Sequence, residues 1–141
     1  MKRIRLSKNF HLDEYIPKEL YLKWQHKPHV LIGLLDYKLI LADQMLRDKF
    51  GSTTINNWWI GGNRNWSGIR TPESPYYSPT SQHSMGRASD KVFKDVTAHE
   101  VRSYIKMHYR ALGITCIEEN VSWVHSDCRW TNKEELHLVY P

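Results

Sequence analysis

The spacing of apolar residues predicts helices in the N-terminal third of the chain. Pro17 suits the first turn of a short helix through "PKELYLKW", residues 17–24. A longer helix is predicted from Pro28, because apolar residues recur there with a helical period of about 3.6 until Gly51 supplies a stop signal. The apolar positions of this stripe are Leu31, Leu34, Leu35, Leu41, Ala42 and Met45.

The pattern changes after residue 51. "STTINNWWI", residues 52–60, is rich in β-branched and aromatic residues and predicts a strand. Residues 61–80 are dense in glycine, proline, serine and asparagine and predict a long loop. Long ordered loops in compact domains are often functional. "RASDKVF", residues 87–93, predicts a short strand after this loop.

A capping box predicts the next helix. Thr97 and Glu100 have the spacing T-x-x-E, and the helix is expected to end near Gly113. One face of this helix carries Val101, Tyr104, Ile105, His108 and Leu112. We therefore expect His108 at the core or its boundary, and His99, in the capping turn, in solvent.

Short strands are predicted for the C-terminal part. "ITCIE", residues 114–118, and "VSWVHSDCR", residues 121–129, favour two strands joined by a tight turn at Glu119 and Asn120. "LHLVY", residues 136–140, alternates apolar and polar residues and predicts a last strand. Together the elements predict an α+β fold in which N-terminal helices pack on a small, mainly antiparallel sheet.

Length and composition narrow the class of protein. The 141 residues suffice for one domain, residues 1–141, and 40% hydrophobic with 25% charged residues is typical of soluble globular proteins. The longest apolar run, "VLIGLL" at residues 30–35, is far shorter than the roughly 20 residues of a membrane helix. The basic start lacks the apolar stretch of a signal peptide. We expect cytoplasmic synthesis, with release by lysis or carriage on a particle if the protein acts outside the cell.

The net charge of +5 is compatible with polyanionic surroundings, but the basic residues are scattered, which favours a solubilising surface charge. We do not expect nucleic-acid binding, because the chain has no RNP, zinc-finger or helix-turn-helix pattern. Cys116 and Cys128 are too few and too far apart for a zinc knuckle. Buried free thiols are the simplest interpretation, with a disulfide as the alternative.

The stretch "SPTSQHSMGRASDKVF", residues 78–93, concentrates metal-binding residue types. His83 and Asp90 are suitable zinc donors, and Gly86 and Ala88 between them let the chain turn and pack closely. His125 can supply a third donor from a neighbouring strand.

Asp127 lies two residues after His125 and therefore on the same face of a strand, where it can hold the histidine in place. The chain has eight histidines, and most of them have ordinary roles. On spacing alone, a surface or hydrogen-bonded role for His83 and His125 remains the alternative.

The stretch "SQHSMGRASD" follows the pattern S-x-H-x-x-G-x-A-x-D at Ser81, His83, Gly86, Ala88 and Asp90. It resembles the signature of the zinc D-Ala-D-Ala carboxypeptidase family, whose fold is also called the hedgehog/DD-peptidase fold. "SGIR", residues 67–70, and "WVHSD", residues 123–127, resemble two further family elements in order and spacing. The resemblance covers roughly residues 30–130 and is strongest to the short, single-domain branch of bacterial and phage proteins.

This resemblance implies a metal-binding cleft in which His83, Asp90 and His125 hold one Zn²⁺ ion and a zinc-activated water attacks the substrate. Arg70 would meet a substrate carboxylate or carbonyl, and a structural salt bridge is the alternative. The implied substrates are peptides that contain D-amino acids, chiefly the stem peptides of bacterial peptidoglycan. A monomeric or virion-associated protein is expected.

The chain departs from the family at one catalytic position. Many members have a glutamate three residues before the last histidine, where it handles the protons of the reaction, but Ser122 stands there in this sequence. Glu118 and Glu119 are the candidate replacements if the turn brings them over the metal, and solvated turn residues are the alternative.

Two classes of function therefore remain open. The first is a zinc carboxypeptidase or endopeptidase that degrades cell-wall peptides. The second is a non-catalytic zinc-containing module of the same fold that binds the cell wall or belongs to a virion. The aromatic residues Trp66, Tyr76 and Tyr77 of the long loop are the candidates for a cleft wall.

Overall fold

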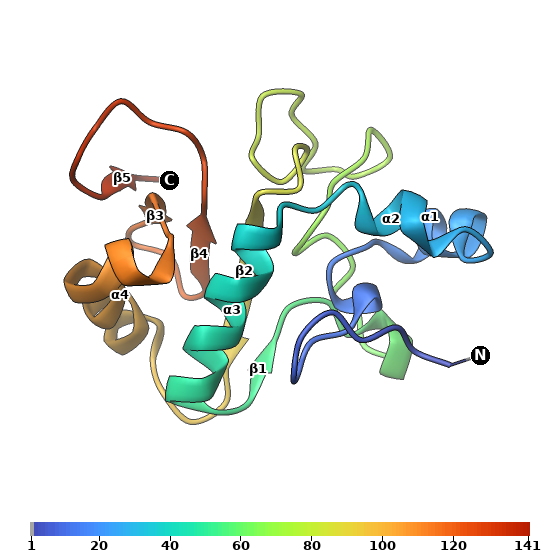
Figure 1. Ribbon diagram of the computed structural model, residues 1–141, viewed down its shortest axis with the longest axis horizontal. Coiled ribbons are helices and arrows are strands. Elements are labelled where there is room, and N and C mark those ends of the chain that lie inside the picture. The colour runs from blue at the N-terminus through green and yellow to red at the C-terminus, as the bar shows by residue number, and fades with distance from the viewer. Residues whose placement is uncertain (1) are drawn as a thin grey trace.

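A computed structural model describes residues 2–141 and combines four α-helices and two short 3-10 helices with a small mixed sheet (Figure 1). The elements in chain order are η1 (Leu12–Glu14), α1 (Lys18–Trp24), α2 (Pro28–Ile32), α3 (Tyr37–Phe50), β1 (Thr53–Thr54), η2 (Trp58–Ile60), β2 (Ala88–Phe93), α4 (Ala98–Leu112), β3 (Cys116–Glu118), β4 (Val124–Asp127) and β5 (His137–Val139). The predicted α+β class is confirmed. Within residues 2–141, no helix combines the length and apolar character that crossing a membrane requires.

The sheet has the strand order β1-β2-β4-β3-β5. Its first three pairings are antiparallel, as predicted, whereas β5 runs parallel to β3. The parallel pair arises because the chain leaves β4, passes through residues 128–136 and returns along the far edge of β3 (Figure 1). The sheet is therefore mixed.

Helices α3 and α4 cover one face of the sheet, and α3 crosses in front of β2 in Figure 1. Their apolar side chains form one core with the sheet, made of Ala42, Leu46, Val101, Ile105, Leu112, Ile114, Ile117 and Val124. The two short N-terminal helices belong to another cluster, in which Tyr21 of α1 and Leu31 of α2 pack with Ile69 and with Trp58 and Trp59. The expectation that N-terminal helices pack on the sheet therefore holds for α3.

The prediction of a single long helix between Pro28 and Gly51 is wrong, because residues 33–36 interrupt the helix between α2 and α3. Asp36 caps α3 by accepting a hydrogen bond from the Lys38 amide at 2.9 Å, and its own amide donates to the Gly86 carbonyl at 2.9 Å. Gly86 has a φ of 70°, and a Cβ atom there would overlap the Leu34 carbonyl. The break thus provides the docking place for the loop that carries the histidine motif.

The strand predicted for residues 52–60 is reduced to Thr53–Thr54. Beyond it the backbone finds other partners: the Asn56 amide donates to the Glu14 carbonyl at 3.1 Å, and Trp58 Nε1 donates to the Ile16 carbonyl at 2.9 Å. Residues 61–80, all of them described, form the predicted loop without helix or strand.

The capping box of α4 is confirmed. The Glu100 amide donates to Thr97 Oγ1 at 3.1 Å, and the Thr97 amide donates to Glu100 Oε2 at 2.7 Å. His108 is exposed and lies against Tyr104, with ring centroids 4.3 Å apart, so its predicted place at the core boundary is wrong. His99 is exposed, as expected.

The connection between β3 and β4 is longer than the tight turn that we predicted. It occupies residues 119–123, and Asn120 adopts a φ of 59°. The last predicted strand is confirmed as β5.

Candidate metal centre

Two strands and one loop bring together three side chains of types that bind metals. Strands β2 and β4 pair so that Asp90 lies directly opposite His125, which places both side chains on the sheet face remote from α3 and α4. His83 comes from the loop before β2, and its Nδ1 lies 2.9 Å from the Gly68 carbonyl. Gly68 permits this arrangement, because a Cβ atom there would overlap the backbone of Tyr15.

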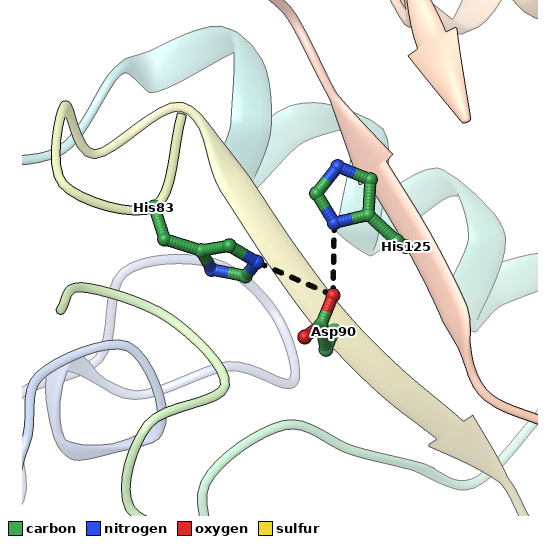
Figure 2. A group of neighbouring side chains, drawn as sticks. All are labelled: His83, Asp90 and His125. Carbon is green, nitrogen blue, oxygen red and sulfur yellow. Dashed lines mark hydrogen bonds and ion pairs between the residues drawn. The ribbon is translucent and has the colours of Figure 1, made fainter. Parts of the chain in front are cut away.

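The hydrogen bonds decide which nitrogen of each histidine is free to bind a metal. A carbonyl only accepts, so His83 Nδ1 carries the hydrogen and Nε2 points toward Asp90 Oδ1 at 3.3 Å. His125 Nε2 donates to Asp127 Oδ2 at 2.8 Å, which leaves Nδ1 facing Asp90 Oδ1 at 2.9 Å (Figure 2). The ligand atoms of the three residues lie within 4.8 Å of one another and could hold a metal ion.

The donor set fits zinc. Two imidazole nitrogens and one carboxylate oxygen are the ligand types that zinc takes in proteins. Each histidine also has an outer partner that fixes its ring, Gly68 for His83 and Asp127 for His125, as ligating histidines require. The same two imidazole nitrogens and one carboxylate oxygen can also bind other first-row transition metals.

The electrostatics of the centre favour positive charge. Burial alone would lower the pKa of His125, but its hydrogen bonds to Asp127 and Asp90 outweigh burial and raise the pKa to about 9. Burial would raise the pKa of Asp90, yet the neighbouring rings of His125 and His83 hold it well below its usual range. Two carboxylates, one buried and one partly buried, that stabilise an imidazolium also stabilise a bound cation.

Asp127 is itself held by an arginine that sequence reasoning missed. Arg129 donates through Nε to Asp127 Oδ1 at 2.8 Å and through Nη2 to Oδ2 at 2.7 Å. Burial opposes ionisation, but Arg129 and His125 together lower the pKa of Asp127 to about 2. The alternation in "HSDCR" places His125, Asp127 and Arg129 at every second position, and this was the available signal.

The metal-binding group lies in a cavity of about 790 Å³. Arg70 lines it and is fixed by two hydrogen bonds, from Nη2 to Asp90 Oδ2 at 2.9 Å and from Nε to the Trp66 carbonyl at 2.8 Å. Its guanidinium also lies 5.5 Å from the ring centre of Tyr76. Trp66 and Tyr76 line the cavity as expected, while Tyr77 is not among its lining residues.

A second arginine, Arg64, also lines the cavity and was not singled out from the sequence. Its Nε donates to the Ile55 carbonyl at 2.7 Å and its Nη2 to the Asp90 carbonyl at 3.2 Å. Burial lowers its pKa. Arg64 therefore supports the backbone of Asp90, and the polar loop sequence around it carries no signal of that role.

The two candidate general bases lie on different sides of the sheet. Glu118 lines the cavity, and extending the β3–β4 register by one residue sets it opposite His125. Glu119 is paired with Lys106 of α4, 2.7 Å from Nζ to Oε1, on the helix-covered side. Ser122 lines a small hollow beside Lys91 and Val124 on the same helix-covered side.

Both cysteines are free, so the disulfide alternative is wrong. Cys116 is buried beside Asp127, and burial followed by the charge of Asp127 raises its pKa to about 12. Burial likewise raises the pKa of Cys128 to about 12. These thiols stay protonated and are poor metal ligands at neutral pH.

Comparison of the chain with protein-family models, with curated proteins and with solved structures finds no match. The chemistry of the site therefore rests on its own residues.

Proposed function

We propose that this chain is a zinc metallopeptidase of the zinc D-Ala-D-Ala carboxypeptidase type, with the hedgehog/DD-peptidase fold. Its substrates would be D-amino-acid-containing peptides of bacterial peptidoglycan. The observation that carries the proposal is the convergence of His83 Nε2, Asp90 Oδ1 and His125 Nδ1 in the cavity of about 790 Å³. These are the three residues that the sequence motifs single out for zinc.

The residues around the three ligands supply the remaining functions of a peptidase. Zinc, when bound, supplies a Lewis acid that activates water for attack on a peptide carbonyl. Glu118 lines the same cavity and is the group that would take and return the proton. The guanidinium of Arg70 is held at the cavity wall, where it can donate to a substrate carbonyl or carboxylate.

A non-catalytic zinc module that binds the cell wall or belongs to a virion is the second candidate. One observation favours it. Ser122 occupies the position where many members of the family that the motifs resemble have the catalytic glutamate, and it lies with Lys91 and Val124 on the helix-covered side of the sheet. A serine there cannot act as a base at neutral pH. In this alternative the zinc would stabilise the fold and the cavity would only bind.

The experiment that tests the proposal measures metal content and hydrolysis separately. Purified protein should contain zinc in a one-to-one ratio with the chain, and mass spectrometry of digested muropeptides should show shortened or uncrosslinked stem peptides. The size of the products separates carboxypeptidase from endopeptidase action. Absence of hydrolysis by zinc-loaded protein on walls of several bacterial types would favour the non-catalytic module.

The two glutamates provide a matched pair of variants. Glu118→Gln should keep zinc and reduce hydrolysis at least about tenfold, because general acid-base catalysis is typically worth about 10²- to 10⁴-fold. Glu119→Gln should keep both zinc and activity, since its partner is Lys106 on the other side of the sheet. The reverse order of effects would contradict the assignment of Glu118.

A further inference from the structure

A second cavity, of about 490 Å³, lies next to the metal-binding cavity. Arg129, which is two residues after Asp127 in the sequence, lines both cavities and forms part of the wall that they share. Its lining includes Tyr109 and Arg110 of α4 and Trp130 of the connection between β4 and β5. The proposed hydrolysis of a peptide makes no use of this second cavity.

Among residues 2–141, Trp130 is the most exposed of the large apolar side chains, at 82%. Tryptophan is highly buried on average, and this exposed ring does not stand alone on the surface but lines a cavity together with Tyr109. The backbone on which it stands is anchored: the Arg129 carbonyl accepts from Thr115 Oγ1 at 2.5 Å, and the Cys128 amide donates to the Arg87 carbonyl at 3.1 Å. Hydrogen bonds therefore fix the backbone of the segment that carries the exposed ring.

The three arginines that line the cavity are already engaged. Arg129 is paired with Asp127, Arg87 Nε lies 3.7 Å from Asp36 Oδ2, and Arg110 Nη2 donates to the Glu134 carbonyl at 3.4 Å. The remaining charged groups of the lining are the bases Lys38 and Lys133 and the acids Glu134 and Glu135. A polyanion would therefore meet as many acids as lysines, whereas a neutral ligand with many hydroxyl groups could use all these polar groups as donors and acceptors.

We propose that the second cavity binds the glycan to which the substrate peptide is attached, in the form of N-acetylated amino sugars. A sugar ring has an apolar face that suits the exposed ring of Trp130 and the half-buried ring of Tyr109, and hydroxyl and amide groups that suit the surrounding polar atoms. This inference rests on the proposed function, because the stem peptides of peptidoglycan are attached to N-acetylated amino sugars. The peptide would occupy the first cavity and the sugar the second, with Arg129 between them.

The test uses tetra-N-acetylchitotetraose, a peptide-free amino-sugar oligomer, and isothermal titration calorimetry with the full chain, both metal-free and zinc-loaded. Trp130→Ala should weaken binding at least about tenfold, the equivalent of about 1.4 kcal/mol. Trp130→Phe, which keeps an aromatic face, should stay within about threefold of wild type. Ile60→Ala is the control, since Ile60 is 77% exposed on η2 and is absent from the lining of both cavities.

Either of two titration results with the sugar would overturn the inference: no binding of the oligomer by wild type, or equal binding by wild type and Trp130→Ala. Binding of a glycerol-phosphate oligomer in place of the sugar, lost in salt, would also overturn it in favour of an anionic polymer. The test of the glycan site can be distinguished from the test of the proposed function, because one measures sugar binding and the other measures peptide hydrolysis. Sugar binding by metal-free protein, together with no hydrolysis by zinc-loaded protein, would support the glycan site and reject the peptidase.

Discussion

Replacement of Asp127 by asparagine tests how the centre selects the metal-binding nitrogen of His125. Asp127 is 1% exposed and accepts hydrogen bonds from His125 and, through two oxygens, from Arg129. The negative charge keeps hydrogen on Nε2 of the imidazole and so presents Nδ1 to the metal. Asparagine has nearly the same shape but no charge, and its amide group competes for the same nitrogen.

The cost to stability follows from the pKa of Asp127, which is about 2 against an ordinary 3.8. Such a lowering corresponds to about 2 kcal/mol of folding free energy at neutral pH. Because the folded-state pKa is lowered, this contribution is present above pH 3.8 and is lost as the pH falls toward about 2. The Asp127→Asn protein should therefore lose about 2 kcal/mol at pH 7, and the difference should shrink in acid.

The effect on the metal is the diagnostic part of this prediction. Loss of an outer partner of a ligating histidine typically weakens metal binding by about 10- to 100-fold. Zinc affinity measured by competition with a chromophoric chelator should fall in that range. The imidazole resonances of metal-free protein should also show a His125 pKa well below its value of about 9.

A matched control is available at the other end of the chain. Asp13 is also 1% exposed and is held by both Nε and Nη2 of Arg3, at 2.9 and 2.6 Å. Asp13→Asn likewise removes a buried carboxylate that accepts two hydrogen bonds from one arginine, and it should leave zinc affinity unchanged. If Asp127→Asn loses stability but binds zinc as tightly as wild type and Asp13→Asn, the role assigned to Asp127 is refuted.

Three further predictions concern single side chains. His83→Ala and His125→Ala should each lose bound metal by elemental analysis, and unchanged stoichiometry in both would reject the ligand set. Arg70→Lys should fold but lose most turnover, because lysine cannot make the planar two-point contact; full activity with a lowered melting temperature would make Arg70 purely structural. Burial raises the pKa of Glu14 from 4.5 to about 7, so its contribution to stability is lost as pH rises through that range. Glu14→Gln should remove this decline and so raise the free energy of unfolding at pH 8, measured by denaturation, by up to about 3 kcal/mol. An unchanged dependence of stability on pH would contradict the prediction.

Local sequence determined the features whose partners are close in the chain. The capping box at Thr97 and Glu100 forms as predicted, because its hydrogen bonds join residues three apart. The strand at residues 88–93 was readable from the pattern of "RASDKVF", and the loop before it from its glycine, proline and serine content. The motif residues His83, Asp90 and His125 were also identified from the sequence, and the structure brings them together.

The tertiary structure alone decided how these features are arranged. The helical stripe after Pro28 shows no break in its periodicity, yet the chain is interrupted so that the Asp36 amide can reach the Gly86 carbonyl, fifty residues away. Strand register places Glu118 in the cavity and sends Glu119 to Lys106, although the two glutamates are neighbours with the same chemistry. Adjacent residues of a strand point to opposite faces. Which face holds the site depends on contacts between distant segments, and these contacts leave no periodic trace in the sequence.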